Sequence, residues 1–68
     1  MIANENELQT TLKRISRFHE QVSLLRRTET NSVNYRASVG GFLAEIDRMQ
    51  LEVREYFSVL PAELPKSA

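Results

Sequence analysis

One apolar repeat in the second half of the chain constrains the fold more than any other feature. Apolar residues recur there in alternating steps of four and three, without a miss, at Tyr35, Val39, Phe42, Ile46, Met49, Val53, Tyr56 and Leu60. This heptad spacing places all eight side chains along one seam of an α-helix. A helix with such a seam needs a second helix to cover it, so we expect an all-α fold.

The first half of the chain carries a second apolar series with helical spacing. Its members are Leu8, Leu12, Ile15, Phe18, Val22 and Leu25. When the heptad spacing is applied to this first half, the seam has two lines of residues seven apart. One line holds Leu8, Ile15 and Val22, and the other holds Leu12, His19 and Arg26. The two series predict a helix over about residues 5–27, a turn over about 28–33 and a second helix over about 34–58.

Polar residues and prolines mark the ends of both predicted helices. Asn4, followed three residues later by Glu7, resembles a capping box. The stretch 28–32 breaks the apolar repeat and offers several side chains able to cap the second helix. Pro61 should end that helix near Ser58, which leaves residues 61–68 as a loose tail beyond a single domain of residues 1–60.

Gly40 and Gly41 lie inside the second predicted helix and are its weakest point. Two glycines cost about 2 kcal/mol relative to alanine in a helix interior. We expect the helix to continue through them because Tyr35 and Val39 keep the phase of the later seam. The glycines are then either a tolerated weak spot or a site where another backbone approaches closely, and a break before Phe42 is the alternative.

An antiparallel hairpin aligns the two series when paired residue numbers sum to 61. This register sets Leu8 against Val53, Leu12 against Met49, Ile15 against Ile46, His19 against Phe42 and Val22 against Val39. Each residue at heptad position a then faces a residue at heptad position d of the other helix, as antiparallel helices require. In this register His19 is a polar seam residue.

The hairpin leaves more apolar surface than two helices can cover. The surplus residues, predicted to form an oligomer or partner interface, are Leu43, Leu51, Tyr56, Phe57 and Leu60. Only Ile2 is available opposite the last three. A 68-residue monomer is also marginally stable by size alone, so we predict a homodimer that forms a four-helix bundle.

The charges balance overall but are unevenly distributed. Nine basic and nine acidic residues argue against binding to nucleic acid or a membrane through bulk charge. Arginines gather at the turn end (Arg26, Arg27 and Arg36), and glutamates gather at the open end (Glu5, Glu7, Glu52 and Glu55). Two such rods side by side are better matched antiparallel than parallel. The absence of cysteine indicates a cytoplasmic protein.

No pattern in the sequence predicts chemistry. His19 is the only histidine, and it lacks the second ligand of any metal motif, so we expect no metal, no cofactor and no enzymatic activity. Glu45 and Asp47 are two residues apart and fall on different helix faces. Lys13, Arg14 and Arg17 form a small basic patch, which leaves a small nucleic-acid-associated regulator as a less favoured alternative.

The second half of the chain also resembles a group of known proteins. The residues that carry the similarity are Asn34-Tyr35-Arg36, Gly41-Phe42-Leu43-Ala44-Glu45-Ile46 and Val53-Arg54-Glu55-Tyr56. The block Thr30–Pro61 is similar to the C-terminal block of small uncharacterised bacterial helical proteins of antitoxin-like size. This resemblance implies a small helical subunit that dimerises and masks a toxin. The sequence thus predicts a non-enzymatic protein–protein interaction module that self-associates, with an antitoxin-like or adaptor subunit as the alternative.

Overall fold

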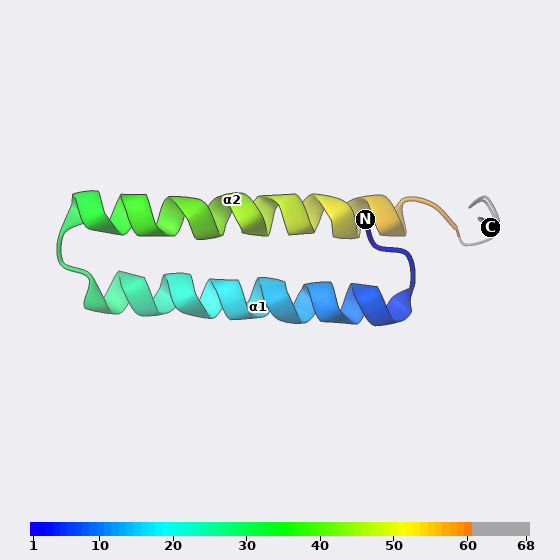
Figure 1. Ribbon diagram of the computed structural model, residues 1–68, viewed down its shortest axis with the longest axis horizontal. Coiled ribbons are helices and arrows are strands. Elements are labelled where there is room, and N and C mark those ends of the chain that lie inside the picture. Colours follow the sequence, from blue (N-terminus) through cyan, green and yellow to red (C-terminus); the bar gives the residue numbers. More distant parts are fainter. Residues whose placement is uncertain (61–68) are drawn as a thin grey trace.

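The computed structural model describes residues 1–60 and consists of two helices packed side by side (Figure 1). Helix α1 spans Glu5–Thr28 and helix α2 spans Ser32–Phe57, and they run antiparallel. The rod measures 50 × 18 × 17 Å. The all-α hairpin expected from the two apolar series is confirmed.

The start of α1 is fixed by a variant of the expected capping box. The Asn4 side chain accepts a hydrogen bond from the Glu7 backbone N–H at 2.9 Å. The Glu7 carboxylate accepts from the Ala3 N–H at 2.9 Å, one residue before the donor that an ordinary capping box uses. Because of this shift, Glu7 also holds the segment that leads into the helix.

The turn between the helices ends in a second asparagine cap. The Asn31 side chain accepts from the N–H groups of Val33 and Asn34, at 2.9 and 3.1 Å, and α2 begins two residues earlier than we expected. At its other end the Ser58 N–H donates to the carbonyl of Arg54 at 3.0 Å. This end agrees with the stop predicted from Pro61, while the predicted tail of residues 61–68 lies outside the described residues.

The core is a single row of apolar side chains between the helices. The buried residues are Ile2, Leu8, Ile15, Val39, Ile46 and Met49. Ile15, Ile46 and Met49 form one cluster, against which the half-buried Phe18, Val22 and Val53 pack. The predicted meeting of Ile15 and Ile46 is therefore present.

The predicted place of His19 in the seam is wrong. Its ring is exposed, and the neighbouring Phe18 occupies the position opposite Phe42, with ring centroids 5.5 Å apart. Leu12, on the same line as His19, is 38% exposed rather than buried against Met49. Phe18 takes the seam because burying a phenyl ring gains more free energy than burying an imidazole, which loses its hydration.

Helix α2 continues without a break through Gly40 and Gly41, as we expected. Both glycines have ordinary negative φ angles. A Cβ atom placed on either would meet no atom within 4 Å outside its own helical backbone. Within this chain the glycines therefore border open space, and a close approach at this point would require another chain.

Candidate interaction surface

One long side of the hairpin carries a network of ion pairs. Arg14 of α1 lines a surface hollow of about 410 Å³ together with Arg48, Met49 and Glu52 of α2. These residues therefore face the same side of the hairpin, which we call the ionic side. Among them, Arg48 and Glu52 form an ion pair.

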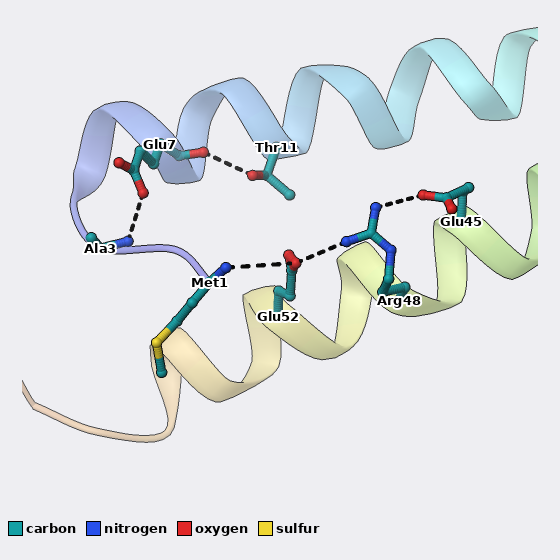
Figure 2. A network of polar contacts seen from close by, with 7 residues as sticks. All are labelled: Met1, Ala3, Glu7, Thr11, Glu45, Arg48 and Glu52. Atoms are coloured by element: carbon teal, nitrogen blue, oxygen red, sulfur yellow. Dashed lines mark hydrogen bonds and ion pairs between the residues drawn. The ribbon is translucent and has the colours of Figure 1, made fainter.

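Arg48 is the centre of the polar contacts on the ionic side (Figure 2). Its guanidinium donates to the carboxylate of Glu45 and, at 3.1 Å, to that of Glu52. The hydrogen bond to Glu45 raises the pKa of the Arg48 guanidinium above its ordinary value. Glu52 also lies 3.9 Å from the amino group of Met1. These exposed pairs add little stability, but they keep the ionic side hydrated.

The segment before α1 covers part of the apolar surplus. Residues 1–4 turn back toward the C-terminal end of α2 (Figure 1), and the Ile2 side chain is only 8% exposed. Ile2 and Tyr56 line a common hollow with Val59. Tyr56, a predicted interface residue, is consequently half-buried within its own chain.

The opposite side of the hairpin, which we call the open side, lacks this cover. On α1 the open side lies across the Leu8–Ile15–Val22 line from Arg14. On α2 it lies across the Val39–Ile46–Val53 line from Glu52. Helical geometry assigns to it Leu12, Ser16, His19 and Ser23 from α1, and Leu43, Gln50 and Phe57 from α2. The same geometry places two charged residues of α2 on this side, Asp47 between Leu43 and Gln50 and Arg54 between Gln50 and Phe57.

Large apolar groups reach solvent on the open side. Leu12 is 38% exposed, Leu43 is 44% exposed and Phe57 is 66% exposed. Leu51, at the outer margin of this side, is 54% exposed. Exposed apolar side chains of this size on one side of a small protein are typical of an interaction surface.

The predicted interface residues thus differ in exposure and position. Leu43, Leu51 and Phe57 lie on or beside the open side and are exposed. Tyr56 is half-buried under the N-terminal segment, although its ring still packs edge-on against that of Phe57, with centroids 5.8 Å apart. Leu60, the last described residue, is 67% exposed beyond the end of α2.

The predicted basic patch faces two directions. Lys13 and Arg17 are four residues apart on the outer surface of α1, and both are exposed. Arg14 instead lines the hollow on the ionic side, next to Glu7 and Glu52. Acidic neighbours therefore reduce the positive potential at one of the three positions.

Some features of this surface were not apparent from the apolar pattern alone. The apolar repeat predicts the surplus on α2 but not the uncharged stripe on α1, formed by Leu12, Ser16, His19 and Ser23. A signal for it was present, because steps of three and four between these residues place them on one helix face. Leu12 and His19 also satisfy the seam spacing, so spacing alone does not separate this stripe from the seam.

Residues 1–60 offer few features typical of a metal or ligand site. The histidine, aspartate and glutamate side chains there form no group of three able to hold a metal ion. No polar or charged side chain is buried in this part of the chain. Neither α1 nor α2 carries the long apolar stretch that crossing a membrane would need.

Comparison of the chain with protein-family models, with curated proteins and with solved structures found no match to any of them.

Proposed function

We propose that this protein is a non-enzymatic interaction module that works by self-association, two hairpins combining into a four-helix bundle. The observation that carries this proposal is the row of large apolar side chains left exposed on α2. Leu43, Leu51 and Phe57 are each 44–66% exposed in the isolated chain. Covering such side chains contributes about 25 cal/mol per Å² of apolar surface, which favours association.

The small core supports the same proposal. Only six residues are buried in residues 1–60, and one of them, Ile2, lies outside the helices. A hairpin of this kind covers one face of each helix and leaves the other faces to solvent. Packing a second hairpin on the open side would convert exposed leucine and phenylalanine into core and so stabilise both chains.

A pair of charge substitutions tests the proposal. Leu43→Glu should weaken association at least tenfold, because it buries a carboxylate in the interface. Val33→Glu is the matched control: Val33 is more exposed, at 73%, but lies in the first turn of α2, where a glutamate is favourable. Size-exclusion chromatography with light scattering should show a smaller species for the Leu43 variant alone. Equal elution of both variants and the unmodified chain would contradict the proposal.

The second candidate function is that of an antitoxin-like or adaptor subunit, in which a different protein occupies the same surface. The exposed apolar row favours a protein partner of either kind, since it is complementary to apolar surface and not to phosphate. Affinity purification of the tagged chain from its native cell separates the two. Recovery of a second protein in a one-to-one ratio would favour the adaptor, whereas recovery of this chain alone supports self-association.

A further inference from the structure

We infer that the second copy packs antiparallel on the open side in one register, in which Arg36 of each chain pairs with the partner's Asp47. This inference rests on the proposed self-association and adds the contact that aligns the two copies. Two observations carry it. The charges of α2 on the open side have no counterpart within residues 1–60, and the order of residues along this side of α2 is self-complementary.

Three charged side chains of α2 lie on the open side: Arg36, one heptad before Leu43, and Asp47 and Arg54. All three are exposed, and none forms an ion pair within residues 1–60. The residues three and four positions from each of them in the chain are uncharged. Arg48 on the ionic side is different, because two glutamates of its own helix accept hydrogen bonds from it. The open-side charges are therefore left for a contact outside the hairpin.

The order of residues along the open side of α2 is self-complementary about the point midway between Gly40 and Leu43. Arg36 and Asp47 lie at equal distances from this point and carry opposite charges. Gly40 and Leu43 also lie at equal distances from it, one without a side chain and the other with a large one. A two-fold axis through this point turns α2 antiparallel to its copy. Each arginine then comes opposite an aspartate, and each leucine opposite a glycine.

The contact at the centre of this register is apolar and closely fitting. Leu43 is 44% exposed, and a Cβ atom on Gly40 would meet no atom within 4 Å outside its own helical backbone. The space beside Gly40 can therefore receive the partner's Leu43, as a ridge of one helix fits into a groove of another. The pairs of Arg36 with Asp47 flank this centre. Ion pairs at the rim of an interface keep part of their hydration, so they set the alignment rather than supply most of the affinity.

This register keeps the two copies of Asp47 apart. An antiparallel pair centred on Asp47 itself would bring the two aspartates together at the axis. With the axis between Gly40 and Leu43, they are separated along the helices by eleven residues, about 16 Å at 1.5 Å per residue. Each aspartate instead comes level with the partner's Arg36.

The same axis also aligns the ends of α2 and the middle of α1. Arg54 comes level with the partner's Glu29, whose carboxylate accepts a hydrogen bond from the N-cap residue of α2. Phe57 follows one turn later and lies against the partner's turn. On α1, Ser16 comes opposite the partner's Ser23, and both side chains are small and uncharged. The register therefore adds a second pair of opposite charges at each end.

A parallel arrangement would place like charges together at the turn end. An axis along the rod stacks α1 on the partner's α2. Ile15 and Ile46 belong to one core cluster and mark the same height along the rod. Arg26 lies eleven residues after Ile15, and Arg36 lies ten residues before Ile46, so the partner's Arg36 would come level with Arg26. The charges thus favour the antiparallel direction.

Exchange of the two charges tests this register. Arg36→Asp and Asp47→Arg should each weaken association about fivefold at low ionic strength, because each creates two like-charged contacts across the axis. The double variant restores both pairs, so its dissociation constant should return to within about twofold of the unmodified value. Arg36 and Asp47 are too far apart to meet within one helix, and the exchange keeps the net charge. This recovery therefore requires contact between chains.

Arg17→Asp combined with Asp47→Arg is the matched control. Arg17 is exposed on the outer surface of α1, and this pair of substitutions also keeps the net charge. We expect this variant to associate as weakly as Asp47→Arg alone. Sedimentation equilibrium gives the dissociation constant of every variant, and circular dichroism checks that each keeps its helix content.

The outcomes separate this inference from the proposed function. Failure of the double exchange to recover, or equal recovery in the Arg17 control, would overturn the register, while a dimer of the unmodified chain would leave the proposed function standing. A folded monomer of the unmodified chain would refute self-association and the register together.

Discussion

Phe18 and Phe42 meet edge to face across the hairpin, with ring centroids 5.5 Å apart and ring planes inclined by 75°. This contact fixes the rotation of α1 about its axis. With Phe18 turned toward α2, the next residue, His19, must point away from the seam and into the open side. The orientation of one aromatic pair thus decides which side chains of α1 are available to a partner.

Substitution at this pair should separate the two neighbouring residues of α1. Phe18→Ala should lower the free energy of unfolding by about 2–4 kcal/mol, somewhat less than for a fully buried ring, because Phe18 is half-buried. His19→Ala should change it by about 0.5 kcal/mol or less in the monomeric hairpin, since its ring is exposed. Urea unfolding of both variants, followed by circular dichroism, gives the comparison. A larger loss for His19 than for Phe18 would show that the rotation of α1 is different.

A second pair of neighbours tests the phase of α2. Ile46 is 3% exposed in the centre of the core, and its replacement by alanine should cost about 2–5 kcal/mol through lost contacts and a cavity. Asp47 is exposed, and Asp47→Ala should cost about 0.5 kcal/mol or less. Thermal unfolding at one protein concentration measures both. Similar losses at the two positions would be incompatible with the seam described here.

The sequence predicted α2 better than α1 for a physical reason. In α2 the alternation of four and three has a single phase, so Val39, Ile46 and Met49 were correctly expected in the seam. In α1 two neighbouring lines satisfy the same seven-residue spacing, one through Phe18 and one through His19. Spacing cannot choose between them, whereas the burial energy of the phenyl ring does.

The packing of the N-terminal segment is a second feature that the apolar pattern does not predict. Ile2 was recognised as the only apolar residue available near Tyr56, but the reach of the chain back across α2 depends on the turn held by Asn4 and Glu7. Such a contact is tertiary and leaves no periodic signal. The open side has the same origin, because the exposed apolar side chains of α1 and α2 can be assigned to one side only when both helices are oriented.

The asparagine cap of α2 should be measurable on its own. Asn31→Ala removes an acceptor for two backbone N–H groups, and its expected cost is about 1 kcal/mol. Asn34→Ala is the control, since alanine has the higher helix propensity at this exposed helical position and should stabilise by a few tenths of a kcal/mol. Chemical unfolding curves of the two variants should therefore shift in opposite directions. A neutral Asn31 variant would mean that other groups cap α2.

Replacing both glycines tests whether they serve an interface. Gly40→Ala with Gly41→Ala should raise helix content and stabilise the hairpin by up to about 2 kcal/mol, because added methyl groups meet open space. If a partner helix passes close to this point, the same variant will associate more weakly, and we expect some weakening. Circular dichroism and sedimentation of the double variant report the two effects separately. A loss of helix content would contradict the continuous helix.

Sedimentation equilibrium of the unmodified chain across the micromolar range tests self-association most directly. We predict a species of about twice the 7.9 kDa chain mass, with a thermal unfolding midpoint that rises with protein concentration because only the folded chain associates. A helical, cooperatively unfolding species of 7.9 kDa over the whole range would contradict the account.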